Sequence, residues 1–251
     1  MRRALIGALA LVALGTAACT SISPTTTASA NGRGPSYVFV AMGESGANGF
    51  RGGPPDLRSQ WTQLFYRSTL GTGNVLYDLT SRGQTVAEVL SSVLPQALAV
   101  HPELATVWLS TADILAGTTP SVYEQELQQL VEALKNAGAT VLLANAAPPD
   151  VFPALASCES DPSDCNSQGG PTLSSPALES TVSAYDNVIA AVARQTGADM
   201  VNVHSALERD VQVGGVENVL SSGGKALSNV GATAVAHAFG AQLPGRFRKA
   251  N

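Results

Sequence analysis

The sequence has few charged and few aromatic residues: 13% of its 251 residues are Asp, Glu, Lys or Arg, and 5% are Phe, Trp or Tyr. Acidic residues outnumber basic ones by 19 to 14, which gives a formal net charge of −5. Binding to nucleic acid requires clustered cations, and the sequence has no basic stripe, so we expect no nucleic-acid partner. The hydrophobic content of 45% is nevertheless sufficient for a folded domain.

The sequence also lacks an apolar run of about 20 residues, the length that spans a bilayer. Its first residues are two arginines, an uncharged apolar stretch from Ala4 to about Leu14, and small residues up to Cys19. This order is typical of an export signal, so we interpret residues 1–18 as a signal peptide. Residues 19–34 are rich in Ser, Thr, Ala and Gly and are predicted to be a flexible tether. A single domain is then expected over residues 35–247.

Cysteine is scarce as well, with three in the chain. The ending Ala17-Ala18-Cys19 resembles a bacterial lipobox, although Thr16 replaces the usual aliphatic residue. The resemblance implies acylation of Cys19 and an exported protein that its lipid anchors to the outer side of the bacterial cell membrane. Plain secretion after cleavage near Ala18 is the alternative.

The other two cysteines, Cys158 and Cys165, lie close together in a Ser/Asp/Pro-rich stretch. In an oxidising compartment such a pair predicts a loop disulfide. Two thiols without a nearby His or second Cys pair are too few ligands for a closed zinc site. No metal, nucleotide or flavin cofactor is expected.

Short apolar runs alternate with helical patterns along the domain. Such uninterrupted runs are typical of strands buried on both faces of a parallel sheet. The predicted strands are Tyr37–Met42, Val75–Leu79, Ala105–Leu109, Thr140–Ala144 and Met200–Val203. The predicted helices are about Asp56–Leu70, Val86–Val100, Ser121–Asn136, Pro176–Thr196 and Asn229–Phe239. The order predicts a doubly wound, flavodoxin-like α/β fold with a five-stranded parallel sheet, in which ligands bind at the carboxyl ends of the strands.

The loops at those ends contain a recognisable set of residues. Gly43-Glu44-Ser45-Gly46 follows the first strand, Gly83 the second, and Ser110-Thr111-Ala112-Asp113 the third. A segment from Ser222 to Gly231 follows the fifth. Here the chain, over residues 36–240 or so, resembles the SGNH or GDSL-type serine ester hydrolases, which have a three-layer α/β/α fold. The resemblance implies that Ser45 occupies the nucleophile position and Gly83 an oxyanion-hole position, with Glu44 in place of the usual Asp.

Three catalytic groups of that family are missing from the matched positions. Ala112 stands where the family has its oxyanion Asn, and an alanine side chain cannot donate to an oxyanion. When the last block is aligned on Ser228 and Gly231, Gly223 replaces the triad Asp and Ala226 replaces the triad His. The sequence therefore does not encode the family's literal triad.

Two residues are candidates for a substitute base. His204 follows the fifth predicted strand at the end where the site is expected, and Lys225 is adjacent to the family's His position. A desolvated lysine serves as a base if its pKa falls. His101, before the third strand, and His237, in the final helix, have unfavourable positions. Asp113 and Glu44 are read as acceptors for nearby loop amides.

Three functions remain open from the sequence. The first is a cell-envelope lipoprotein that binds a small acyl-ester or glycan-type ligand with little or no turnover. The second is an active esterase that uses Ser45 with His204 or Lys225. The third is a scaffold that binds a partner and makes no use of the old site.

Overall fold

The domain is built around a parallel sheet of five strands in the order β2-β1-β3-β4-β5. The structure, a computed structural model, describes residues 36–45, 60–70, 73–151, 175–221 and 226–249. The strands are β1 Val38–Gly43, β2 Val75–Thr80, β3 Leu104–Trp108, β4 Thr140–Ala144 and β5 Asp199–Val201. All neighbours pair in parallel; Val40, for example, lies opposite Tyr77 of β2 and Ala105 of β3. The predicted doubly wound α/β fold is confirmed.

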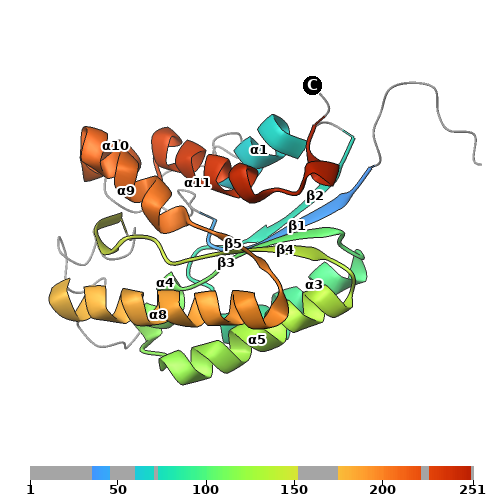
Figure 1. Ribbon diagram of the computed structural model, residues 1–251, viewed down its shortest axis with the longest axis horizontal. Helices are drawn as coiled ribbons and strands as arrows, with labels where there is room; N and C mark the ends of the chain where they lie inside the picture. Colours follow the sequence, from blue (N-terminus) through green and yellow to red (C-terminus); the bar gives the residue numbers. More distant parts are fainter. Residues whose placement is uncertain (1–35, 46–59, 71–72, 152–174, 222–225, 250–251) are drawn as a thin grey trace, which may run out of the picture. The chain divides into compact units, whose positions relative to one another are not determined.

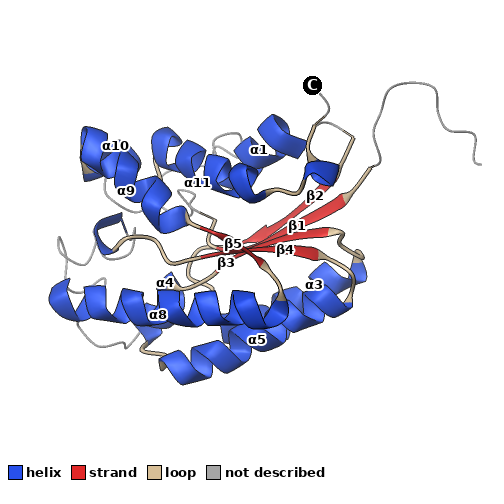
Figure 2. Cartoon of the chain, in the orientation of Figure 1, coloured by secondary structure: helices blue, strands red, loops and turns tan. Residues whose placement is uncertain are grey.

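Helices cover both faces of the sheet (Figures 1 and 2). On one face lie α1 Trp61–Phe65 with η1 Tyr66–Leu70, α9 Val203–Gly214, α10 Val216–Val219 and α11 Asn229–Gln242. The other face is covered by α2 Val86–Glu88, η2 Val89–Val93, α3 Leu94–Ala99, α4 Thr111–Ala116, α5 Pro120–Asn136 and α8 Ser175–Thr196. Two short turns, η3 Pro149–Val151 and η5 Gly245–Phe247, complete the described elements. None of these helices is long and apolar enough to cross a membrane.

An aromatic cluster packs α1 and α11 against the sheet. The rings of Trp61 and Phe239 are stacked, with centroids 4.6 Å apart, and Trp61 meets Trp108 of β3 edge-on at 6.1 Å. Phe65 and Phe239 are fully buried beside them. Large rings of this kind contribute much of the buried apolar area of a small domain, so they fix this helical layer close to the carboxyl end of β3.

The predicted bounds that fall on described residues agree with the structure to within a few residues, except after β5; the predicted start of the first helix, Asp56, lies outside the described residues. The sequence suggests a strand through Val203, but Asn202 caps α9 by accepting a hydrogen bond from the amide of Ser205 at 2.9 Å. Val203 therefore begins a helix that the apolar pattern did not reveal. Gly138 and Gly197 follow α5 and α8 with φ of 92° and 68°, the left-handed conformation that the sequence suggested there.

Candidate functional site

The loop after β1 carries Ser45 away from the sheet at a point where only glycine fits. Gly43 has φ +96°, and a Cβ on it would lie 2.0 Å from the carbonyl oxygen of Trp108 in β3. The next amide, that of Glu44, donates to that same oxygen at 2.7 Å. Where the chain exits β1, its backbone therefore lies in close contact with the end of β3. Ser45 lies just beyond and is 8% exposed.

Gly83 lies in the loop after the neighbouring strand β2. The amide of Ser81 donates to the carbonyl of Gly43 at 2.9 Å, so the loops after β1 and β2 leave the sheet side by side. Gly83 has φ +76°, and a Cβ placed on it would meet no atom within 4 Å. There is thus open space beside the residue that the family resemblance matches to the oxyanion hole.

The loop after β3 brings Ala112 and Asp113 to the same end of the sheet. Both side chains are buried, at 2% and 1% exposure. Oδ2 of Asp113 accepts the amide of Val86 at 3.0 Å, which ties the first turn of α4 to the start of α2. Asp113 is therefore a structural acceptor for a loop amide, as the sequence suggested. Ala112 presents only a methyl group.

The last segment of the family pattern forms a helix cap. Oγ of Ser228 accepts the amides of Val230 and Gly231 at the start of α11, and its hydroxyl donates to the carbonyl of Asn218 at 2.6 Å. A Cβ on Gly231 would lie 2.4 Å from the carbonyl oxygen of Val219, so a glycine is required there. Ala226, at the position of the family's His, is 1% exposed. Gly223 and Lys225 lie outside the described residues, as do Cys19, Cys158 and Cys165.

Two buried carboxyl groups lie beside the Ser45 position. Burial raises the pKa of Glu44 from 4.5 to about 7, while a hydrogen bond with Thr111 and the charge of Arg82 oppose that shift. Burial likewise raises the pKa of Asp113 from 3.8 to about 6, opposed by the hydrogen bond from Val86. Both groups therefore change protonation near neutral pH.

His204 belongs to a different part of the molecule. It lies in the first turn of α9, after β5, and β3 and β4 separate β5 from β1. At about 4.8 Å per strand this places the end of β5 roughly 14 Å from the end of β1. A general base must be within hydrogen-bond reach of the proton it accepts, directly or through one water. The placement argues against His204 as the base for Ser45.

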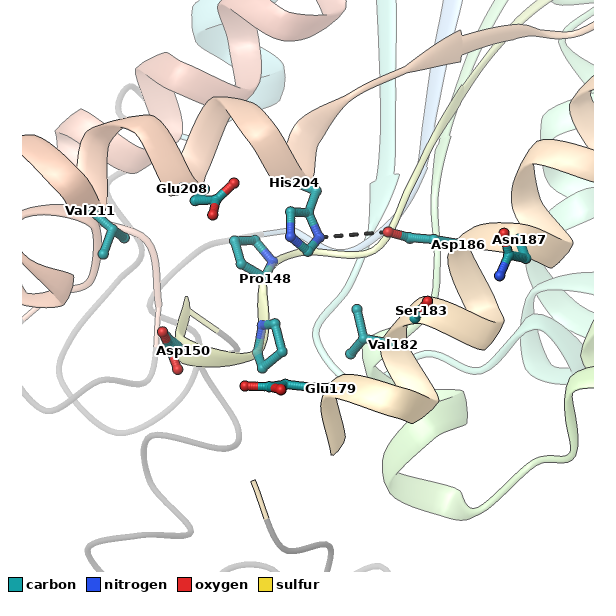
Figure 3. Close-up of a pocket in the computed structure, with 11 residues that line it drawn as sticks. Pro148, Asp150, Glu179, Val182, Ser183, Asp186, Asn187, His204, Glu208 and Val211 are labelled. Carbon is teal, nitrogen blue, oxygen red and sulfur yellow. Dashed lines mark ion pairs between the residues drawn. The ribbon is translucent and has the colours of Figure 1, made fainter. Parts of the chain in front are cut away.

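The imidazole of His204 is instead paired with Asp186 of α8 (Figure 3). His204 Nδ1 and Asp186 Oδ2 are 3.6 Å apart. The backbone amide of His204 donates to Asn145 Oδ1 at 3.0 Å, and Asp186 Oδ1 accepts the amide of Ala146 at 2.8 Å. The loop after β4 therefore holds both partners. The sequence did not single out Asp186 or Asn145; an Asn directly after a predicted strand was the available signal for the latter.

The pair lines a pocket of about 440 Å³ between α8 and α9. Its walls include Pro148, Val182, Ser183 and Glu208. Among the described residues there is no group of three or more His, Cys, Asp and Glu side chains placed to hold a metal ion. Of the remaining histidines, His237 is exposed on α11, and His101 precedes β3 at the opposite end of the strand.

Comparison with solved structures supports the fold. TesA is 22% identical, with a TM-score of 0.57 over 80% of this chain and 94% of TesA. LAE5, described as an alpha/beta hydrolase enzyme from the metagenome of Lake Arreo, Spain, is 17% identical with a TM-score of 0.60, covering 82% and 94% of the two chains. Axe2, an acetylxylan esterase from Geobacillus stearothermophilus, is 16% identical with a TM-score of 0.60, covering 82% and 93%. No curated protein matches the chain.

A family model identifies the chain more directly. The model of the GDSL-like lipase/acylhydrolase family matches residues 41–213. The matched region contains Ser45, Gly83 and Ala112 and ends before Gly223 and Ala226. With the strand order and the three strand-end loops in agreement, the chain belongs to the GDSL-like lipase/acylhydrolase family.

Proposed function

We propose that this protein binds a small acyl-ester or glycan-type ligand at the Ser45 position without appreciable turnover. The observation that carries the proposal is the pair of buried alanines, Ala112 and Ala226, at the positions matched to the family's oxyanion Asn and catalytic His. A methyl group neither donates to an oxyanion nor accepts a proton. The chain keeps the family's fold and the strand-end loops that carry Ser45 and Gly83, and methyl groups replace two of the groups that perform the chemistry.

The missing groups have a large expected effect on rate. Loss of one oxyanion donor alone typically slows turnover by about 10²–10³-fold. Loss of the base and its carboxylate lowers it by many more powers of ten, although such losses do not simply multiply. His204 does not compensate, because it is paired with Asp186 and lies across the sheet. Of the family's matched oxyanion-hole residues, Gly83 is kept and the Asn is replaced by Ala112.

The test is covalent labelling with a fluorophosphonate, read by intact mass. Residues 33–251 form a compact unit and are suited to this experiment. We expect no stoichiometric labelling of the folded domain, and no difference from Ser45→Ala. Stoichiometric labelling that is lost in Ser45→Ala would show an activated hydroxyl and overturn the proposal in favour of an esterase with an unassigned base, for which Lys225 would be the next candidate.

We propose further that the protein is exported and held at the membrane by a lipid on Cys19. The support is the order of basic, apolar and small residues over residues 1–19. Metabolic labelling with an alkyne fatty acid in a bacterial host tests the proposal. We expect label and membrane association in the full chain and neither in Cys19→Ser. If both the parent protein and Cys19→Ser are released into the medium without the label, the result would instead indicate plain secretion.

A further inference from the structure

Basic side chains gather at one end of the sheet, the end at which the strands begin. The described residues contain eight lysines and arginines, of which two, Arg82 and Arg209, lie in segments that follow the carboxyl ends of β2 and β5. The other six lie in the C-terminal segment or in the last turns of helices that lead back to the start of a strand. We call these six residues the basic end: Arg67, Lys135, Arg194, Arg246, Arg248 and Lys249.

Printed contacts hold the C-terminal segment at the starts of the strands. The ring of Phe247 in η5 packs edge-on against Tyr37, the residue before β1, with centroids 4.8 Å apart. The guanidinium of Arg246 donates to Oγ1 of Thr140, the first residue of β4. The amide of Lys249 donates to a carbonyl of η1, which leads to β2, at 2.8 Å. The C-terminus therefore lies beside the start of β1, as Figure 1 shows.

The ends of two long helices bring further cations to the same place. Lys135 and Arg194 lie in the last turns of α5 and α8, which return the chain to the starts of β4 and β5. Nζ of Lys135 donates to the carbonyl of Gly197 at 2.8 Å, so the two helix ends are in contact. The cations come from separate segments of the chain, which is why no basic stripe is visible in the sequence.

Few acids oppose these cations at this end of the sheet. Three acidic side chains lie near the starts of β3 and β5 or near the end of α5: Glu103, Glu132 and Asp199. Six cations against three acids leave three net positive charges. Within the described part of the chain, none of Arg246, Arg248 and Lys249 forms an ion pair, and all three are exposed. Their charges therefore remain available to an external partner.

The opposite end of the sheet is acidic. Acids occupy the first turns of α2, α4, η3 and α10: Glu88, Asp113, Asp150 and Glu217. A strand of the length of β1 spans about 20 Å. The Debye length is about 10 Å in 0.1 M salt. Negative charge at the carboxyl ends of the strands is thus largely screened from a surface that touches the basic end.

The chain also enters the domain at this end. Ser36 and Tyr37 precede β1, and the predicted tether, residues 19–34, connects them to Cys19, the proposed site of the lipid. A coil of that length has a root-mean-square end-to-end distance of about 22 Å. A lipid on Cys19 would therefore keep the start of β1, and with it the basic end, close to a bilayer surface.

We propose that the basic end lies on the anionic headgroups of a phospholipid bilayer, so that the Ser45 position faces away from it. The inference rests on the proposed lipid anchor and specifies how the anchored domain is oriented. Each lysine or arginine near an anionic surface strengthens binding about fivefold. Such attraction alone does not hold an unlipidated chain on cells, but it orients a domain that the lipid has brought there. The ligand of the Ser45 position would then come from the side remote from the bilayer.

The test is co-sedimentation of residues 33–251, the compact unit without the lipid, with vesicles. The probes are vesicles of phosphatidylglycerol, which is anionic, and of phosphatidylcholine, which has no net charge. In 0.1 M NaCl the protein should bind phosphatidylglycerol at least about tenfold more tightly than phosphatidylcholine. In 1 M NaCl, where the Debye length is about 3 Å, that preference should disappear.

Charge-removing variants locate the contact. Arg246→Gln and Lys249→Gln should each weaken binding to phosphatidylglycerol by about fivefold. Arg209→Gln is the matched control, because Arg209 is exposed on α9, after the carboxyl end of β5, and loses the same charge. It should leave the binding unchanged. Circular dichroism checks that all three variants are folded.

Hydrogen exchange gives a second readout of orientation. With phosphatidylglycerol vesicles present, amides of residues 245–249 and 100–104 should exchange more slowly, because they lie at the basic end. Amides at the start of α4, after the carboxyl end of β3, should exchange as before. Slower exchange at the start of α4 without a change at residues 245–249 would place the opposite end on the bilayer and overturn the proposal.

The remaining outcomes also decide the matter. No binding to phosphatidylglycerol, equal binding to both lipids, or an equal loss of affinity in Arg209→Gln would overturn the proposal. Binding to soluble polyphosphate but not to phosphatidylglycerol vesicles would overturn it in favour of an anionic polymer as the partner. Failure of the lipid anchor is detected separately by fatty-acid labelling of Cys19, whatever the vesicle experiments give.

Discussion

At the residue scale, the glycine before the nucleophile position is determined by backbone sterics. Gly43 combines φ +96° with a distance of 2.0 Å from a built Cβ to the carbonyl oxygen of Trp108. Gly83 has a similar φ of +76° but open space around it. Substitutions at the two positions therefore allow two contributions to the free energy of unfolding to be measured separately: that of an unfavourable φ, and that of a clash with a neighbouring strand.

Gly43→Ala should lower the free energy of unfolding by more than about 3 kcal/mol, because the end of β3 must move to relieve the clash. Gly83→Ala should lower it by only about 1 kcal/mol, the cost of the left-handed backbone alone. Urea denaturation monitored by circular dichroism measures both. Equal losses in the two variants would mean that the contact with Trp108 is not tight in solution.

At the scale of elements, α11 begins at a cap that belongs to the family's last motif. Ser228 accepts two amides in the first turn of α11, and its hydroxyl donates to the carbonyl of Asn218 in α10. In contrast, the side chain of Thr119, at the start of α5, caps no backbone amide of that helix and lies 3.3 Å from the hydroxyl of Ser121. The motif serine thus has a structural purpose that remains when the neighbouring catalytic histidine is absent.

Replacing that cap should destabilise the domain measurably. Ser228→Ala should lower the free energy of unfolding by about 1 kcal/mol, the usual contribution of an N-cap side chain. Thr119→Ala is the matched control and should change it by less than about 0.5 kcal/mol. Chemical denaturation of both variants gives the comparison. A Ser228→Ala variant as stable as the parent would indicate that water replaces the cap.

The sequence predicted four of the five strand–helix units well, because their apolar patterns are periodic and because Gly138 and Gly197 mark the ends of two of the helices. It failed around β5, where a short strand of three residues is followed at once by α9. The apolar run Met200–Val203 continues into the helix, so hydrophobicity alone could not locate the boundary; the capping by Asn202 decides it. Contacts between distant segments, such as that of His204 with Asp186, were likewise beyond a reading of local pattern.

The candidate site was predictable to a similar extent. The positions of Ser45, Gly83 and Ala112 could be identified from the resemblance and from the rule that strand ends form sites. The burial of Glu44 and Asp113 could not, because it depends on how three loops pack together. The separation of His204 from Ser45 follows from the strand order of the predicted flavodoxin-like fold, in which the fifth strand lies three positions from the first.

At the scale of the whole molecule, burial of carboxyl groups makes stability depend on pH. The pKa values of Glu44 and Asp113 are raised from 4.5 and 3.8 to about 7 and about 6, and burial also raises that of Asp186. Between the ordinary and the raised values, the folded protein binds more protons than the unfolded one. Stability therefore falls as pH rises through this window.

We expect the urea midpoint to be higher at pH 5.0 than at pH 7.5. The double variant Glu44→Gln/Asp113→Asn should show a smaller difference, because these side chains no longer titrate. Denaturation series at several pH values measure the effect. A midpoint that rises from pH 5.0 to 7.5 in the parent would contradict the assigned direction.

The steric requirement at Gly43 and Gly231 also affects how such proteins are recognised. Both glycines belong to motif segments of the family, yet each is required because a side chain would collide with a carbonyl oxygen of an adjacent segment. A sequence search that depends on these two glycines therefore finds proteins with this fold. The residues at positions 112 and 226 instead indicate whether the protein has the family's catalytic groups. Sorting the family by the second pair of positions should separate catalysts from binders more reliably than any overall similarity score.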